Sequence, residues 1–163
     1  MEQERDPAKL KQKLLEFARG FPFYQLIGFE VSDFGPSWAQ CQVKARDELQ
    51  NPNGTLHGGV IATLIDATIT QALLMTDEYQ RVRETKGSLA TIDLHVKYLR
   101  PAQRGRLICE ANIVHLGKRV VHARATVRNE QAKEIALGDA SLMLVLGNNA
   151  VTEHTDCANT DRD

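Results

Sequence analysis

The sequence GGVIATLIDATITQALLMT occupies residues 58–76 and is apolar at nearly every position. The run is too long for a typical strand, and a helix that is apolar on every face belongs in a protein core. Its β-branched residues lower the helix propensity locally, but a buried helix remains the best interpretation. The run therefore predicts a central helix surrounded by the rest of the chain.

Beyond residue 87 the hydrophobic pattern changes to a period of two, which is typical of strands. The first such segment alternates Ile92, Leu94, Val96 and Tyr98 with Thr91, Asp93, His95 and Lys97, so the two sets are expected on opposite faces. Further strands are predicted over residues 107–116, 121–128 and 134–146, with turns at 117–118 and 129–132. Strands joined by such short turns are antiparallel neighbours.

The chain before the central helix contains a shorter helix and a hairpin. Apolar spacing and the Asp6-Pro7 start signal predict a helix over residues 8–19. The hydrophobic segment 23–31 leads into a strand, and a turn at 35–37 joins it to a second strand over 38–46. Residues 77–87 are expected to form a charged loop.

Together these elements predict an α+β fold in which one antiparallel sheet wraps around a long central helix. We divide the chain into an N-terminal helix (1–19), one domain (20–147) and a polar tail (148–163) that we expect to be disordered. One face of the sheet covers the helix. Its other, polar face is expected to meet solvent or a charged interface.

Composition excludes several classes of protein. The 163 residues are 42% hydrophobic and 25% charged, which suits one folded domain. The net charge of −1 lacks the positive excess of a nucleic-acid or membrane-surface binder. Neither a signal peptide nor a membrane span is visible, and the three cysteines lack zinc spacing. We therefore expect a cytoplasmic protein with reduced thiols and no metal.

Asp66 is out of place in the middle of the apolar helix, because an ionised carboxylate is rarely buried without a partner. Thr63 and Thr70 lie on roughly the same helix face. In a structural interpretation, Asp66 is hydrogen-bonded to these hydroxyls or to a neighbouring strand. In a functional interpretation, it is a base or nucleophile in a protected cleft. Composition and spacing leave both open.

The same helix begins at His57-Gly58-Gly59. A helix N-terminus has free N–H groups and a positive dipole end, and glycine lets a substrate carbonyl come close. Such a start can form an oxyanion hole from backbone alone. Taken singly, the glycines equally suit a flexible loop end, and His57 suits a capping residue. Their combination with an acid on a buried helix favours a catalytic site.

Residues 51–66, NPNGTLHGGVIATLID, resemble the signature of hotdog-fold acyl-CoA thioesterases of the PaaI-like, phenylacetate-degradation subgroup. The resemblance continues in TIDLHVKYLRPA, residues 91–102, and in the hairpin at 117–118, and it covers roughly residues 20–147. It implies the hotdog fold, hydrolysis of an acyl-CoA to free acid and CoA, and homodimers or homotetramers with sites at the dimer interface. CoA is then part of the substrate, and no cofactor is required.

The resemblance also implies roles for individual residues. Asp66 would be the base or nucleophile, and the Gly58 N–H would form the oxyanion hole. His57 and Asn51 would orient the thioester or the attacking water. Thr91 stands where relatives often have Ser or Thr near the water. Asp66 and Thr91 would come from one subunit, and Asn51 with the helix N-terminus from the other.

CoA carries phosphate groups, and basic residues cluster in or beside two predicted turns: Arg100, Arg104, Arg106, Lys118 and Arg119. Basic residues in turns are usually only solvated. By the resemblance, however, the turns at Arg100 and Lys118 lie near the CoA entrance. Arg100, Lys118 and Arg119 are therefore the candidate phosphate contacts, whereas Tyr98 is expected to be a packing residue.

Two other functions fit the same fold. A non-catalytic hotdog protein would bind acyl-CoA or acyl carrier without turnover. A hotdog 3-hydroxyacyl dehydratase or hydratase would use a His with a carboxylate, for which His57 and Asp66 are candidates. The HGG helix start favours the thioesterase. The acyl group is not identified by the sequence, although the apolar segment 21–29 is a candidate lining for its end.

Overall fold

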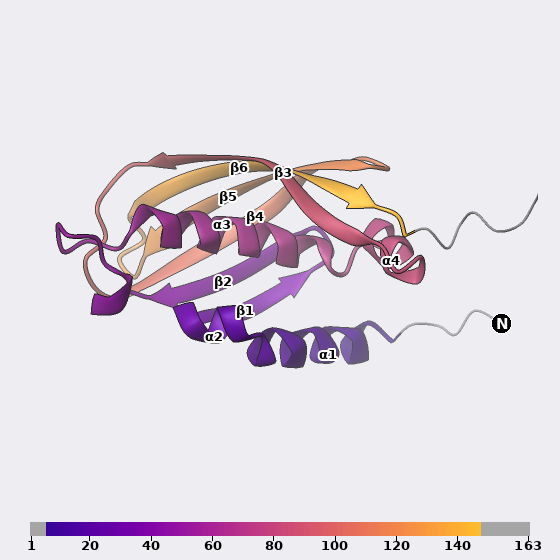
Figure 1. Ribbon diagram of the computed structural model, residues 1–163, viewed down its shortest axis with the longest axis horizontal. Coiled ribbons are helices and arrows are strands. Elements are labelled where there is room, and N and C mark those ends of the chain that lie inside the picture. The colour runs from indigo at the N-terminus through magenta and orange to yellow at the C-terminus, as the bar shows by residue number, and fades with distance from the viewer. Residues whose placement is uncertain (1–5, 148–163) are drawn as a thin grey trace, which may run out of the picture.

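The computed structural model describes residues 6–147, and Figure 1 shows how they are arranged. The elements are α1 (Pro7–Gly20), α2 (Pro22–Ile27), β1 (Phe29–Gly35), β2 (Trp38–Lys44), a 3-10 turn (Asp47–Leu49), α3 (Gly58–Leu73), α4 (Asp77–Glu84), β3 (Ser88–Tyr98), β4 (Arg106–Leu116), β5 (Val120–Asn129) and β6 (Glu134–Val145). One antiparallel sheet wraps around α3, so the predicted α+β class is confirmed. The predicted tail, 148–163, lies outside the described residues.

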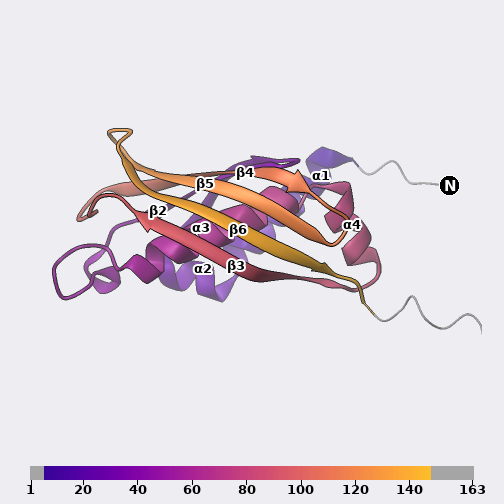
Figure 2. The same cartoon turned by 90° about the horizontal axis from the view of Figure 1, so that it is seen from above.

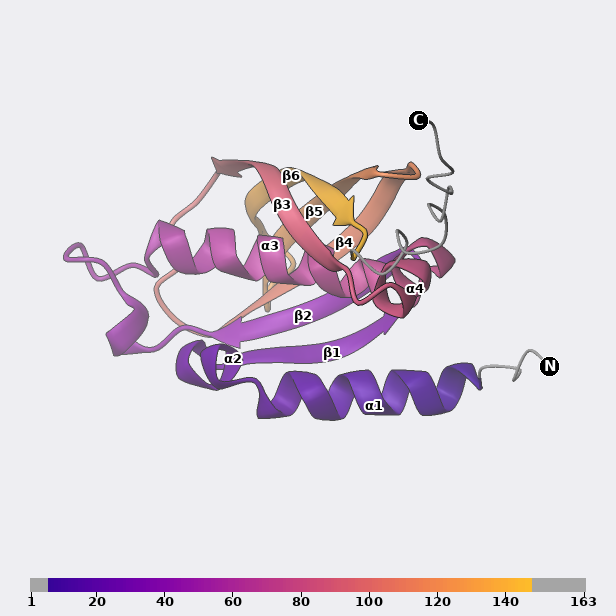
Figure 3. The same cartoon turned by 45° about the vertical axis from the view of Figure 1, so that its right-hand side comes forward.

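The six strands of the sheet lie in the order β1-β2-β4-β5-β6-β3. The predicted β1–β2 and β4–β5–β6 hairpin connections are confirmed, and every pair is antiparallel. Figure 2 looks onto the sheet, with α3 behind it. β1 forms one edge, beside α1 (Figure 3), and β3 forms the other.

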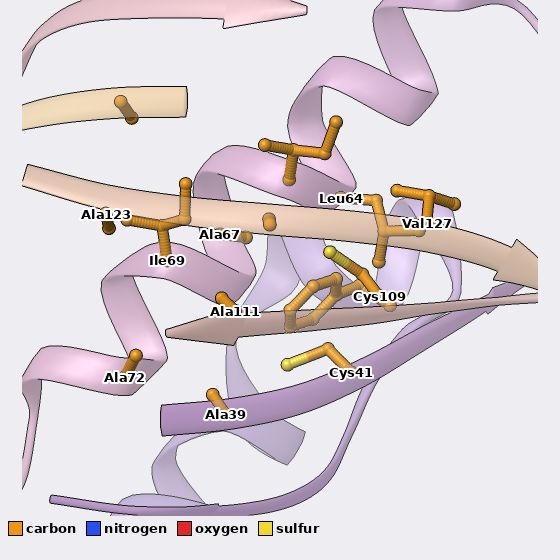
Figure 4. Packing of buried hydrophobic residues seen from close by; sticks show 14 of the residues in the cluster. Ala39, Cys41, Leu64, Ala67, Ile69, Ala72, Cys109, Ala111, Ala123 and Val127 are labelled. Atoms are coloured by element: carbon orange, nitrogen blue, oxygen red, sulfur yellow. The ribbon is translucent and has the colours of Figure 1, made fainter. Parts of the chain in front are cut away.

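α3 is the buried central helix that the apolar run predicts. Its Leu64, Ile65 and Ile69 side chains are almost completely enclosed. The helix packs mainly against β2 and β4, where Figure 4 shows Cys41 and Cys109 beside it. Gly138 of β6 permits close packing, because a Cβ there would lie 2.5 Å from Cγ2 of Ile65. These contacts fix α3 firmly against the sheet.

Residues 77–84 form α4, so the prediction of a charged loop over 77–87 was wrong. The Thr76 side chain caps this helix by accepting the N–H of Tyr79. Acidic residues lie in its first turn and basic residues in its last, where each favours the helix dipole. The helix was missed because the high charge of this segment was taken as a sign of a loop, although the segment carries ordinary helix start signals.

α2 was also missed, because residues 23–27 were included in the segment leading into the first strand. Pro22 stands at the start of this short helix, where proline is well tolerated. Gly28, with φ of 69°, ends it in the left-handed conformation. The predicted strand begins only at Phe29.

A β-bulge breaks the predicted alternation of β3. The register with β6 shifts between Thr91 and Asp93, and the Ile92 side chain is 50% exposed instead of lying in the core. Thr91 therefore faces α3 and not the outer face that strict alternation assigns to it. A period of two cannot reveal a bulge, which explains this error.

The sheet face turned away from α3 is polar. Arg128 forms ion pairs with Glu110 and Glu134, and Arg124 forms one with Asp139. Such exposed pairs contribute little to stability, but they keep this face hydrophilic.

Within residues 6–147, no single helix is long and apolar enough to cross a membrane. α3 and α4 reach the length and apolar composition of a membrane span only when they are taken together, and an 86° bend separates them.

Candidate active site

The N-terminus of α3 is capped by His57. Its Nδ1 accepts the N–H of Gly59 at 2.9 Å, so a neutral ring carries its proton on Nε2. The side chain is exposed, and no residue in the described part of the chain accepts a hydrogen bond from Nε2. His57 therefore combines a capping bond with a second ring nitrogen that can donate to a ligand.

The Gly58 N–H is the first of α3 and has no partner within the helix. Among residues 6–147, no hydrogen-bond acceptor pairs with it. Gly58 lines a pocket of about 320 Å³ together with Asn51, Tyr98 and Arg100. This N–H can therefore donate a hydrogen bond to a carbonyl oxygen bound in the pocket.

Asn51 organises the loop that leads into α3. Its Oδ1 accepts the N–H groups of Asn53 and Thr55, and its Nδ2 donates to the Thr55 hydroxyl at 2.9 Å. Side-chain bonds of this type stabilise tight turns. Asn51 thus holds the loop in place while lining the same pocket as Gly58.

Asp66 lies half-buried in the middle of α3, on the side that meets β3. The Thr91 hydroxyl donates to Asp66 Oδ1 at 2.7 Å. The alternative of bonds from Thr63 and Thr70 is not observed, because the Thr63 hydroxyl donates to the Gly59 carbonyl and no bond joins Thr70 to Asp66 within residues 6–147. Of the structural alternatives, the partner on a neighbouring strand is the one observed.

Asp66 and Gly58 are well separated within one chain. Asp66 is eight positions after Gly58 on α3, which corresponds to about 12 Å along the helix axis. A base and an oxyanion donor acting on one carbonyl must each lie within about 3 Å of the atoms that they serve. One chain therefore contains two separate halves: Asn51, His57 and Gly58 at the helix start, and Asp66 with Thr91 at its middle.

The three basic candidates are also divided between two places. Arg100 lines the Gly58 pocket and donates to the Glu134 carbonyl at 2.7 Å. Lys118 and Arg119 lie in the β4–β5 turn, where the Arg119 carbonyl accepts a hydrogen bond from β6. That end of β6 pairs with the start of β3, whereas Arg100 follows the end of β3. A single chain does not bring them together.

Tyr98 was assigned to packing, and the structure corrects this. Its side chain is 53% exposed, and its hydroxyl donates to the Gly58 carbonyl at 2.8 Å. A Cβ on residue 58 would lie 3.2 Å from the Tyr98 ring, so glycine lets the ring lie against the helix start. Strand alternation placed Tyr98 on the helix side, but it could not reveal what its hydroxyl binds.

The apolar segment 21–29, proposed to line the end of the acyl group, lies mainly in α2 and at the start of β1. Its Tyr24 hydroxyl accepts a hydrogen bond from Gln71 of α3 at 3.3 Å, and burial raises the pKa of Tyr24. Tyr24 and Phe29 line a second cavity of about 550 Å³, which shares no lining residue with the Gly58 pocket. Their role in acyl binding stays a prediction.

Comparisons with known proteins identify the family to which this chain belongs. The profile of the thioesterase superfamily matches residues 53–136. Acyl-coenzyme A thioesterase 13 of Homo sapiens is 33% identical over 132 residues, covering 79% of this chain and 89% of that protein. The medium/long-chain acyl-CoA thioesterase YigI of Escherichia coli K12 is 29% identical over 139 residues, covering 78% and 88%.

A solved structure agrees at the level of the fold. The PaaI protein from the phenylacetic acid degradation operon of Escherichia coli superimposes with a TM-score of 0.74 at 19% identity, covering 86% of this chain and 96% of that one. The hotdog fold implied by residues 51–66 is thereby confirmed. The chain belongs to the thioesterase superfamily and is a thioester hydrolase with a hotdog fold.

Proposed function

We propose that the protein is an acyl-CoA thioesterase that hydrolyses its substrate to a free acid and CoA. The observation that carries this is the carboxylate of Asp66 on α3, which accepts a hydrogen bond from Thr91 of β3. The same helix begins at Gly58, which lines a pocket and whose N–H has no acceptor among residues 6–147. The names of the human and Escherichia coli relatives support acyl-CoA as the substrate class.

In this proposal the Gly58 N–H binds the thioester oxygen as it becomes negative. Asp66 takes a proton from a water molecule that attacks the carbonyl carbon, or it attacks that carbon itself. The carbon–sulfur bond then breaks, and CoA leaves as the thiolate, which is protonated on release. When Asp66 is the nucleophile, water then hydrolyses the acyl–Asp66 anhydride, which releases the free acid and restores the carboxylate. Thr91 orients the carboxylate, while His57 and Asn51 orient the thioester or the water.

We also propose that each site is assembled from two chains. The separation of about 12 Å between Gly58 and Asp66 along α3 is too large for both groups of one chain to act on the same carbonyl. This supports an Asp66 supplied by a partner chain. β3 is an edge strand, and edge strands present unpaired backbone groups to a second strand. Ile92 and Leu99 are 50% and 43% exposed along or just after this edge. Antiparallel pairing of two β3 strands would cover them and form a homodimer.

The same pairing gives a role to the divided basic residues. Antiparallel pairing sets the Ser88 end of one β3 beside the Tyr98 end of the other. Lys118 and Arg119 of one protomer then approach Arg100 of its partner, where the phosphates of CoA would attract all three. This arrangement predicts that salt weakens substrate binding.

Two substitutions at residue 58 test the proposal. Gly58→Pro removes the N–H at the first helical position, where proline is tolerated, and the extended His57 backbone, with ψ of 135°, is compatible with a following proline. Gly58→Ala introduces a Cβ but retains the N–H. We expect kcat for acyl-CoA hydrolysis to be about 10²–10³-fold lower in Gly58→Pro than in Gly58→Ala. Equal kcat values in two folded variants would exclude this oxyanion hole.

A further inference from the structure

The Gly58–Gly59 peptide group connects Tyr98 to His57. The Tyr98 hydroxyl donates to its carbonyl at 2.8 Å, and its N–H donates to His57 Nδ1 at 2.9 Å. We propose that Tyr98 is a positioning residue that keeps the proton of the neutral His57 ring on Nε2 through this chain of hydrogen bonds. Where turnover is concerned, this inference rests on the proposed function.

The direction of each bond in this chain is determined by chemistry. A backbone carbonyl only accepts, so the Tyr98 hydroxyl is the donor; a backbone N–H only donates, so His57 Nδ1 is the acceptor. Hydrogen bonds in series polarise one another, so a donor at the Gly58 carbonyl makes the Gly59 N–H a better donor. The Tyr98 hydroxyl therefore favours the Nε2–H form of His57 through the peptide group that lies between them.

The strand that carries Tyr98 also carries Thr91. Thr91 contacts Asp66 at the middle of α3, and Tyr98 contacts Gly58 at its start. β3 therefore holds both halves of the proposed machinery against one helix. In the two-chain site, a hydrogen-bond donor at His57 Nε2 would face the thioester or the water on which the partner's carboxylate acts. The other tautomer would present an acceptor there instead.

Tyr98→Phe is a mild change, because it retains the ring that lies against Gly58. The side chain is 53% exposed, so removing its hydroxyl leaves no enclosed cavity. Tyr79→Phe is the matched control. Tyr79 is half-buried in α4, and its hydroxyl has no hydrogen-bond partner among residues 6–147.

The first measurement is the tautomer of His57, from the ¹⁵N chemical shifts of its ring in the ligand-free, full-length protein, assigned with His57→Asn. We expect the neutral Nε2–H form to predominate in all three proteins, with a measurably larger population of the Nδ1–H form in Tyr98→Phe than in the wild type or Tyr79→Phe. The second measurement is steady-state hydrolysis of acyl-CoA. We expect kcat of Tyr98→Phe to fall about tenfold, with KM within about twofold of the wild-type value.

The outcomes separate this inference from the proposed function. An unchanged His57 tautomer in Tyr98→Phe overturns the inference whatever happens to turnover. A changed tautomer with kcat equal to that of Tyr79→Phe overturns the positioning role. If the wild type hydrolyses no acyl-CoA, the proposed function fails, whereas the ¹⁵N spectra still decide whether Tyr98 controls His57.

Discussion

The Thr91 hydroxyl donates a hydrogen bond to the Asp66 carboxylate over 2.7 Å, from an edge strand to the central helix. The β-bulge at Ile92 makes this contact possible, because it turns Thr91 toward α3. The bond engages Oδ1 only, and within residues 6–147 no donor is bonded to Oδ2. One carboxylate oxygen is thus held while the other is available for a water molecule or a substrate.

Thr91→Ala removes this bond, and Thr91→Ser retains it. We expect Thr91→Ala to lower kcat by about tenfold, because the loss of a hydrogen bond to a charged group costs about 1.5 kcal/mol or more. Thr91→Ser should remain within about twofold of the wild type. Hydrolysis of one acyl-CoA by the three proteins is the measurement. Equal kcat values for Ala and Ser would show that Thr91 does not orient Asp66.

Two substitutions of His57 separate its capping role from catalysis. Asn is a good N-cap, so His57→Asn should retain the free energy of unfolding, whereas His57→Ala should lose about 1 kcal/mol in urea denaturation. Both remove the imidazole, and we expect both to lower kcat by at least about tenfold. If His57→Asn had wild-type turnover, His57 would be a cap and nothing more.

Heterodimers test whether the site spans two chains. One chain would carry Asp66→Asn and the other Gly58→Pro, with two affinity tags so that only mixed dimers are purified. If each site takes Asp66 from one chain and Gly58 from its partner, one site contains both defects and the other contains none. We then expect about half of the wild-type activity per dimer. A mixed dimer as inactive as its parents would place both groups in one chain.

The buried thiols Cys41 and Cys109 predict a loss of stability at alkaline pH. Burial raises the pKa of both, that of Cys109 to about 12, whereas an unfolded thiol titrates near about 8.5. The unfolded chain therefore loses these protons first. Their contribution to stability is complete below about pH 8.5 and is lost as the pH rises toward the folded-state values.

Urea denaturation at several pH values between about 8 and 11 checks this linkage. Because other groups also titrate there, the control is the double variant Cys41→Ala/Cys109→Ala. Its free energy of unfolding should be lower overall, because two core side chains are shortened, but it should fall less steeply with pH than that of the wild type. Identical slopes in the two proteins would contradict the prediction.

The central helix and the antiparallel hairpins could be predicted because they depend on patterns that extend over many residues. The apolar run around Asp66 is unlike any strand, and the turns between β4, β5 and β6 are short enough to force neighbouring pairing. α4 escaped prediction because its start signal, Thr76 followed by acidic residues, lies in a stretch dense in charge.

The candidate site was predictable only in part. The positions of Asp66, Gly58 and Asn51 follow from their motif, but the direction of Thr91 depends on a bulge that leaves no periodic signal. The Tyr98 contact joins residues forty positions apart, and only the folded chain brings them together. The proposal that each site spans two chains came from the family resemblance, because the pattern of residues within one chain carries no signal for pairing between chains.

The most direct test is steady-state hydrolysis of short-chain, long-chain and aryl acyl-CoAs by the wild type and Asp66→Asn. CoA release would be followed with a correction for the protein's own cysteines, and binding of a non-hydrolysable acyl-CoA analogue would be measured in parallel. The account predicts turnover of at least one substrate class by the wild type and a loss of about 10²–10⁴-fold in kcat in Asp66→Asn, with analogue binding retained. A kcat in Asp66→Asn equal to that of the wild type would contradict the account. It would also be contradicted if the wild type bound the analogue but hydrolysed none of the acyl-CoAs.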